Sequence, residues 1–391
     1  MRIIDIPING FCKPEFQAVK KAFARNFSAH DELGAACCLY VGGEKVVDLW
    51  GGWADKAKTQ AWQEDTLSGF YSVGKALVTI CALHVCGQHS IDIDAPVTDV
   101  WPEYGEHGKD KTTLRHFLTH QAGMPAIRER LPDAALFDWH IMVDALAHQA
   151  PYWEPGTRQG YHTNTFGLLV GEFVRRISGL SIGEYLQKHI AGPLGAEVYI
   201  GLTDTDLTRC AELDWPQESA ILASFHHDFG RELDEDARMR LHAYANPMGI
   251  SSVGVLNSAA WRQAEIPSAN GYGSASGVAC VFNALANGGT QNGHHIVDES
   301  LLKEAYRLQC EGDDFMLNKD MRWGLGFQLT HPNRMLGPNA NSFGHFGNGG
   351  SLGFADPDAN IGFGYTLNRI VRSWGSQQNR ALISAIYDCL P

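Results

Sequence analysis

Near the start of the chain, apolar residues recur first at helical spacing and then in two short continuous runs. The spacing within residues 14–28 predicts an amphipathic helix, whose apolar face would consist of Phe16, Val19, Phe23 and Phe27. The runs at 35–41 and 45–50 are joined by Gly42-Gly43-Glu44 and predict a strand–turn–strand hairpin. We therefore expect a helix followed by two antiparallel strands.

The end of the chain mirrors this arrangement. Residues 350–357 and 360–368 are apolar, glycine-rich runs that flank a Pro-Asp-Ala-Asn turn, and a helical stripe follows, formed by Leu382, Ile383, Ile386, Tyr387 and Leu390. Between the two ends, helical patterns and loops dominate. The simplest architecture is an α+β fold, in which both chain ends build one antiparallel sheet, helices flank it, and a large, mostly helical segment is inserted. The expected division is a sheet domain of residues 1–70 and 320–391 and a helical domain of residues 71–319, with the active site at their interface.

Composition and charge narrow the class of partner. The formal net charge is −13 and no run is rich in Lys or Arg, which argues against nucleic acid and anionic membranes as partners. No long apolar segment predicts a signal peptide or a membrane helix. The nine cysteines are scattered and form no C-x-x-C pair, which favours a reducing, cytoplasmic setting. A small-molecule substrate is expected, and the oligomeric state stays open.

Residues 349–353 spell Gly-Gly-Ser-Leu-Gly, the G-x-S-x-G pattern of a nucleophile elbow. Such an elbow needs a following helix and a histidine further along the chain. No histidine occurs in residues 352–391, and the letters after Ser351 continue as a strand. We therefore expect a glycine-rich strand here, and not the nucleophile.

A second serine has a better context. Ser72 and Lys75 form S-x-x-K at the start of an apolar helical pattern, so both side chains would share one helix face. Free backbone N–H groups at the helix N-terminus favour an oxyanion, and burial lowers the pKa of a lysine so that it can accept a proton. The pattern is short, and a helix-capping serine beside a solvated lysine explains these letters equally well.

The wider context is more specific than either motif. Seven sequence blocks, spread over most of the chain, stand in the order found in one known superfamily. They are residues 65–77, 91–104, 114–125, 155–172, 272–289, 323–329 and 344–369. Together they resemble the serine β-lactamase and penicillin-binding-protein superfamily, in particular class C β-lactamases and family VIII carboxylesterases.

The resemblance implies roles for individual residues. Ser72 would be the acylated nucleophile and Lys75 its proton partner. Tyr161 would act as general base, either as a tyrosinate or as a neutral phenol coupled to Lys75. The backbone N–H groups of Ser72 and Asn348 would form the oxyanion hole.

The chain departs from the family pattern at two places. The asparagine that follows the tyrosine by two residues is replaced by Thr163, with Asn164 one place further on. Either the loop shifts so that Asn164 binds the substrate, or recognition of an amide is lost. The Lys-Thr-Gly strand, which would lie along the substrate, is His345-Phe346-Gly347, so these three residues are candidates to contact the substrate. A histidine is a poorer anchor than a lysine for the carboxylate of a β-lactam. The alternative for His345 is a strand histidine bonded to the backbone. This second departure favours ester substrates, with β-lactam hydrolysis weak or missing.

The predicted function is therefore a serine carboxylesterase for short-chain or small aromatic esters, with Tyr71, Trp153 and Phe346 suited to an apolar acyl pocket. The alternatives are a β-lactamase, an amide hydrolase or D-aminopeptidase, or an acyltransferase of the same superfamily, and a non-catalytic binding protein. The sequence contains no clear glycine-rich phosphate-binding pattern, and no cofactor is expected. His116 and His120 have a spacing that could hold zinc, but H-E-x-x-H is not formed and no third ligand is placed, so structural roles are expected. Residues 205–260 are expected to form a loop-rich wall or lid.

Overall fold

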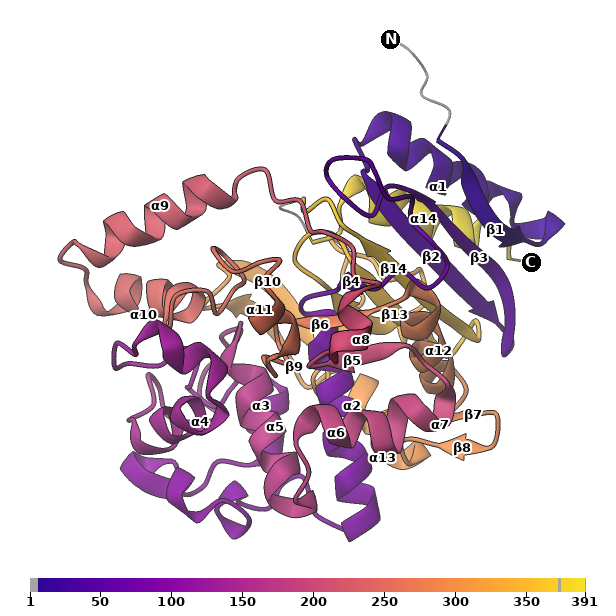
Figure 1. The fold of residues 1–391 in the computed structure, drawn as a ribbon. Helices are drawn as coiled ribbons and strands as arrows, with labels where there is room; N and C mark the ends of the chain where they lie inside the picture. The colour runs from indigo at the N-terminus through magenta and orange to yellow at the C-terminus, as the bar shows by residue number, and fades with distance from the viewer. Residues whose placement is uncertain (1–5, 372–373, 391) are drawn as a thin grey trace.

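A nine-stranded antiparallel sheet is the centre of the fold in the computed structural model, which describes residues 6–371 and 374–390 (Figure 1). The strands, in their order across the sheet, are β1 (Ile8–Cys12), β3 (Glu44–Gly52), β2 (Gly34–Val41), β14 (Ile361–Leu367), β13 (Leu352–Asp356), β12 (Phe343–Phe346), β11 (Gln328–Leu329), β10 (Lys319–Trp323) and β9 (Cys310–Asp314). Two smaller sheets consist of β4 (Ser68–Gly69), β6 (Gly271–Gly273) and β5 (Val198–Ile200), and of β7 (Thr290–Gln291) and β8 (His294–His295).

The two chain ends meet in the middle of the large sheet. Strand β14 pairs with β2 from Ile361↔Val41 to Leu367↔Ala35, so the predicted N-terminal and C-terminal hairpins are neighbours. This confirms the predicted α+β class and the sheet built from both ends. Strand β1 was not predicted, because three of its five residues are exposed at the sheet edge and no alternation marks it.

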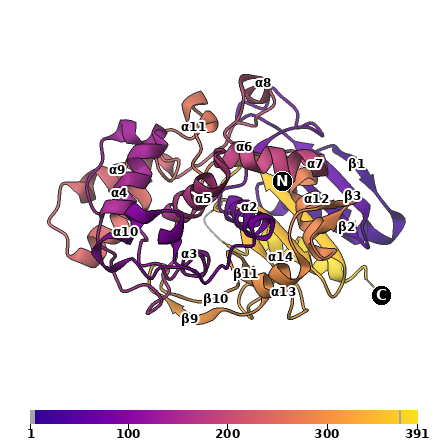
Figure 2. The ribbon, with the colours of Figure 1, turned by 90° about the horizontal axis from the view of Figure 1, so that it is seen from below.

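Helices cover both faces of the sheet. On one face, α1 (Gln17–Ala29) and α14 (Gln377–Tyr387) pack on apolar strand residues, as the two helical stripes predicted. On the other face lie α12 (Ala275–Ala286) and α2 (Val73–His89), which join the larger hydrophobic core. Residues 73–86 of α2 are all buried, as expected for a helix that is apolar on every side and passes through the interior (Figure 2).

The inserted segment forms most of the remaining helices, which spread from the left of Figure 1 across its lower half. These are α3 (Leu114–Leu118), α4 (Trp139–His148), α5 (Thr165–Ser178), α6 (Ile182–Leu186), α7 (Gly192–Leu194), α8 (Asp204–Leu207), α9 (Glu218–Phe229), α10 (Glu235–Ala245), α11 (Ala259–Gln263) and α13 (Glu299–Tyr306). The expected domain boundary before residue 320 stays a prediction; strand β9, which precedes it, pairs along its length with β10. Among the described residues, none of the helices has the length and apolar character needed to cross a bilayer.

Residues 205–260 are more helical than expected. They contain α9 and α10, which project together at the left of Figure 1. Helix α9 buries none of its residues completely, which explains why its sequence lacks a clear apolar face. Its half-buried side chains form one wall of the cavity described below.

Candidate active site

Ser72 lies at the point where the short strand β4 leads into α2. It is the N-cap residue of α2, and its side chain is almost completely buried. The preceding residue, Tyr71, has a φ of 48°, a left-handed conformation that is strained for an aromatic residue. The carbonyl of Phe70 holds this turn in place by accepting a hydrogen bond from the Ser351 hydroxyl at 2.8 Å. The strained turn therefore presents Ser72 at the helix N-terminus.

Lys75 is one helical turn further along α2, as the S-x-x-K spacing predicts. Its Nζ lies 3.1 Å from Ser72 Oγ, 2.6 Å from the carbonyl oxygen of Thr163 and 3.3 Å from that of Ser268. The side chain is fully buried, and desolvation lowers the pKa of Lys75 well below its usual value. A neutral amine has two N–H groups and one lone pair, which match two carbonyls and the Ser72 hydroxyl.

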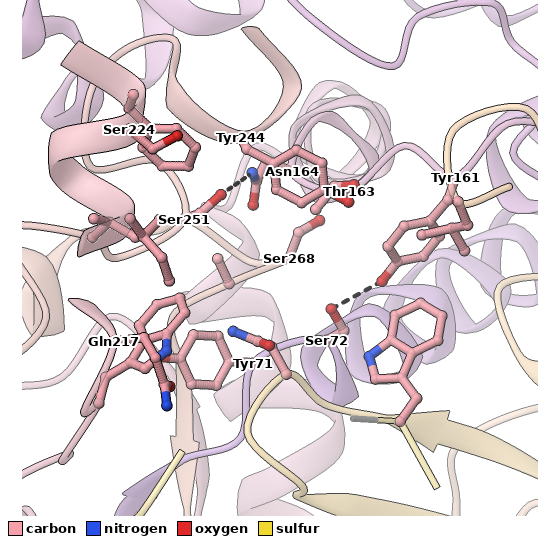
Figure 3. A pocket seen from close by; sticks show the side chains of 18 of the residues that line it. Tyr71, Ser72, Tyr161, Thr163, Asn164, Gln217, Ser224, Tyr244, Ser251 and Ser268 are labelled. Atoms are coloured by element: carbon pink, nitrogen blue, oxygen red, sulfur yellow. Dashed lines mark hydrogen bonds between the residues drawn. The ribbon is translucent and has the colours of Figure 1, made fainter. Parts of the chain in front are cut away.

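Tyr161 is the second side chain that contacts the Ser72 hydroxyl. Its phenol donates a hydrogen bond to Ser72 Oγ at 2.9 Å, as Figure 3 shows. The ring is stacked on Trp323 with centroids 5.5 Å apart, and Lys75 Nζ lies 4.8 Å from the ring centroid. Burial raises the pKa of Tyr161 well above its usual value, although the Ser72 bond opposes this. In the resting site, the electrostatics therefore favour a neutral phenol over the tyrosinate.

A cavity of about 670 Å³ opens beside Ser72 and Tyr161 (Figure 3). Of the predicted site residues, Tyr71, Asn164 and Asn348 also line it. The Asn164 side chain is already engaged, since its Nδ2 donates to the carbonyl oxygen of Ala243 and to Ser251 Oγ, both at 2.8 Å. Thr163 also lines the cavity, and its carbonyl oxygen accepts a hydrogen bond from Lys75.

Four residues predicted to bind substrate do not line this cavity. Phe346 points to the opposite face of the sheet, where it joins the core under α1 and α14, because neighbouring residues of a strand alternate in direction. Trp153 packs behind Tyr161, with its ring against Phe315 at 5.8 Å between centroids.

His345 and Gly347 do not line the cavity either. The His345 ring is completely buried, and its Nδ1 lies 2.7 Å from the carbonyl oxygen of Phe346. Desolvation and the nearby Lys75 lower the pKa of His345 to about 3, so the ring is neutral. A Cβ on Gly347 would lie 2.3 Å from the Phe70 oxygen and 2.0 Å from Ser351 Oγ, which explains the glycine.

The backbone beside the cavity offers two hydrogen-bond donors. In the described part of the chain, the N–H groups of Ser72 and Asn348 donate to no protein acceptor, and both residues line the cavity. For Ser72 this follows from its place at the helix N-terminus.

Ser351, His116 and His120, which the sequence motifs singled out, make hydrogen bonds within the fold. Ser351 is buried and bonded to Phe70, and β13 follows it directly. Nδ1 of His116 accepts the N–H of Thr113 at 3.1 Å, and Nδ1 of His120 accepts that of His162 at 3.2 Å. Among residues 6–371 and 374–390, no three His, Cys, Asp or Glu side chains are grouped to hold a metal ion.

Residues 205–260 were expected to form a wall or lid, but the sequence pointed to no individual residue of the cavity wall there. The apolar side of the wall is formed by Trp215, Ile221, Phe225 and Val253, all from the segment of residues 205–260. Leu317, Lys319 and Trp374 line another part. No local motif marks these positions, because they meet only through the fold.

Comparison with known proteins places the whole chain among related enzymes. A family model described as Beta-lactamase matches residues 21–386. The esterase/beta-lactamase LipL of Mycobacterium tuberculosis is 30% identical over 371 residues, which cover 93% of this chain and 83% of LipL. A solved family VIII carboxylesterase has a TM-score of 0.89 at 39% identity, covering 98% of this chain and 100% of the other. A penicillin-binding-protein homologue from Caulobacter crescentus has a TM-score of 0.88 at 35% identity, with the same coverage of both chains.

Proposed function

Because this chain belongs to the Beta-lactamase family, we propose that it is a serine carboxylesterase that cleaves short-chain or small aromatic esters through an acyl-enzyme on Ser72. The observation that carries the proposal is the pair of contacts to Ser72 Oγ, from Lys75 Nζ at 3.1 Å and from Tyr161 Oη at 2.9 Å. One group can take the serine proton while the other can give a proton to the leaving group, which is the requirement for acyl transfer to a serine.

In the first half of the reaction, neutral Lys75 accepts the proton of Ser72 as Oγ attacks the ester carbonyl. The tetrahedral oxyanion then accepts hydrogen bonds from the N–H groups of Ser72 and Asn348. When the carbon–oxygen bond breaks, the Tyr161 phenol gives its proton to the departing alkoxide. This leaves an acyl ester on Ser72, an ammonium on Lys75 and a phenolate on Tyr161.

In the second half, the phenolate of Tyr161 takes a proton from water, which attacks the acyl carbon. Collapse of the intermediate releases the acid, and Lys75 returns its proton to Ser72 Oγ. The new ammonium beside the ring stabilises the phenolate, so the tyrosinate exists only after acylation. Both groups end in their starting protonation states.

The environment of the site favours esters over β-lactams. A β-lactam carries a carboxylate close to its reactive amide, and β-lactamases of this superfamily offer a lysine on the strand beside the nucleophile. Here that position holds His345, which is neutral, buried and outside the cavity wall. The apolar wall formed by Trp215, Ile221 and Phe225 suits a short aliphatic or aromatic acyl group.

A p-nitrophenyl acyl series and a chromogenic cephalosporin, assayed side by side, test this proposal. Ester turnover should be lost in Ser72→Ala. It should persist in Ser351→Ala, which loses only one buried hydrogen bond worth about 1 kcal/mol. Loss of turnover in a folded Ser351→Ala protein with activity retained in Ser72→Ala would refute the mechanism. Cephalosporin turnover as efficient as ester turnover would refute the substrate class.

A further inference from the structure

Lys319 is the one charged side chain among the described residues that line the cavity; no Asp, Glu or Arg lines it. It is exposed, and in the described part of the chain its Nζ forms no hydrogen bond or ion pair. The esterase mechanism proposed above has no use for this charge. A cationic group at the wall of a substrate cavity attracts anions.

The β9–β10 hairpin fixes the backbone of Lys319 relative to Tyr161. Asp314, the cross-strand partner of Lys319, accepts the N–H groups of Tyr161 at 3.0 Å and of Leu317 at 2.9 Å through Oδ1. The hairpin turn is thereby attached to Tyr161, whose hydroxyl donates a hydrogen bond to Ser72. Lys319 therefore has a defined place beside the site, although its side chain is free to move.

Nearby acids leave the charge of Lys319 largely uncompensated. Asp314 is buried and committed to backbone N–H groups, and burial raises the pKa of its carboxyl, which disfavours the charged form. Asp313 and Asp320 form the cross-strand pair next to that of Asp314 and Lys319, so their side chains point to the other face of the hairpin.

The cavity has two distinguishable sides. Tyr71 belongs to an apolar cluster with Trp215 and Val253, against which Ile221 and Phe225 of α9 pack. Tyr161 belongs to another cluster that includes Leu317, two residues before Lys319. Figure 3 shows Tyr71, Gln217 and Ser251 on the opposite side of Ser72 from Tyr161. Since Tyr161 would protonate the departing oxygen, the leaving alcohol would occupy the Tyr161 side and the acyl group the apolar side.

We propose that Lys319 is an anion subsite for the alcohol part of the ester, so that preferred substrates are esters of short or aromatic acids with alcohols or phenols that bear a carboxylate. This inference rests on the esterase function proposed above. The subsite differs from the carboxylate anchor of a β-lactamase. Lys319 is on β10, two strands from β12 and His345, a separation of about 10 Å at the usual strand spacing. It would reach the far end of a leaving group and not a carboxylate beside the reactive carbonyl.

The test compares 4-butyryloxybenzoate with its uncharged methyl ester in the full-length protein. The measured quantity is the ratio of kcat/KM for the anionic probe to kcat/KM for the neutral probe. We expect Lys319→Met to lower this ratio about threefold to fivefold, the upper part of the range for a solvent-exposed ion pair, and Lys319→Glu to lower it further. Lys319→Arg should retain it. High salt should reduce the ratio in the unmodified protein, because salt screens an exposed charge.

Lys21→Met is the matched control, since Lys21 is an exposed lysine on α1, outside the cavity, and its loss changes the net charge equally. It should leave the ratio unchanged. An unchanged ratio in both Lys319→Met and Lys319→Glu, with both probes hydrolysed, would overturn the anion subsite and leave the esterase intact. An equal fall in Lys21→Met would also overturn it, because net charge would then explain the effect. Failure of the unmodified protein to hydrolyse even the neutral probe would instead overturn the esterase function.

Discussion

Removal of a single oxygen atom, in Tyr161→Phe, separates the two halves of the proposed reaction. The variant loses the 2.9 Å hydrogen bond to Ser72 Oγ but keeps the ring stacked on Trp323 at 5.5 Å, so the packing around the site is retained. The loss of one buried hydrogen bond costs about 1 kcal/mol of stability, which an enzyme of this size tolerates. Any large effect on rate therefore reports the chemical role of the phenol.

The expected effect depends on the leaving group. An alkyl ester needs the phenol to protonate its alkoxide, so kcat/KM should fall by about 10² to 10⁴, the usual contribution of a positioned general acid. At roughly 1.4 kcal/mol for each factor of ten, this is about 3–6 kcal/mol of transition-state stabilisation. A p-nitrophenyl ester releases a stable phenolate without protonation, so its acylation should persist. Its deacylation should slow, because the base that activates water is lost.

Stopped-flow measurement with p-nitrophenyl butyrate, beside ethyl butyrate hydrolysis in a pH-stat, distinguishes the possibilities. We predict a burst of one nitrophenolate per active site in Tyr161→Phe, followed by slow turnover, together with a large loss for the ethyl ester. Tyr306→Phe, on α13 and outside the cavity, is the control for loss of a tyrosine hydroxyl. An equal loss for both esters without a burst would refute the assignment, since it would make Tyr161 the base of acylation.

Three further perturbations follow from buried contacts. Lys75 must be neutral to accept a proton, and burial lowers its pKa, so kcat/KM should rise with pH along an acid limb. Lys75→Arg keeps the charge and should be inactive, and full activity of this variant in a pH-rate series would contradict the role of Lys75 as a base. Gly347→Ala would place a Cβ 2.3 Å from the Phe70 oxygen, so its free energy of unfolding in denaturant should fall by about 1–3 kcal/mol and its activity should decrease. Gly230→Ala, whose Cβ would have no atom nearer than 3.4 Å, should change neither, and equal stability of the two variants would contradict this explanation. Burial raises the pKa of Glu32 to about 8, against ~4.3 in an unfolded chain, so its protonated form stabilises the fold at low pH and this stability is lost as pH rises from about 4.5 to 8. The loss is on the order of 3 kcal/mol at pH 7, and Glu32→Gln should flatten the dependence of Tm on pH in this window; an unaltered pH profile would count against the buried ionisation.

The parts of the fold that could be predicted are those in which one face of an element is buried. Val19 and Phe23 on α1 repeat at helical spacing because only one side of the helix meets the sheet. Ser72 and Lys75 meet because three residues make nearly one turn of α2, and this holds whatever surrounds the helix. Tyr161 is different, since its contact with Ser72 spans 89 residues, and only the resemblance indicated it.

The parts that could not be predicted lack such local constraints. Three of the five residues of β1 are exposed, and the β9–β10 hairpin carries several exposed charged residues, so no alternation marks either. Helix α9 contributes Ile221 and Phe225 to the cavity while burying no residue completely. The prediction that Phe346 binds substrate was wrong for a different reason, because the pattern of the strand already argued against it. The neighbouring residue, His345, faces the α2 side, so strand alternation already directs Phe346 away from the site.

In the proposed mechanism Ser72 carries the acyl group, and a covalent map of the enzyme during turnover identifies the acylated residue. The Tyr161→Phe protein is mixed with p-nitrophenyl butyrate, quenched in acid during the burst, digested and analysed by mass spectrometry. We expect a butyryl ester on the peptide that contains Ser72 and none on the peptide that contains Ser351. A butyryl group on Ser351, or a burst without any modification of the Ser72 peptide, would contradict this mechanism.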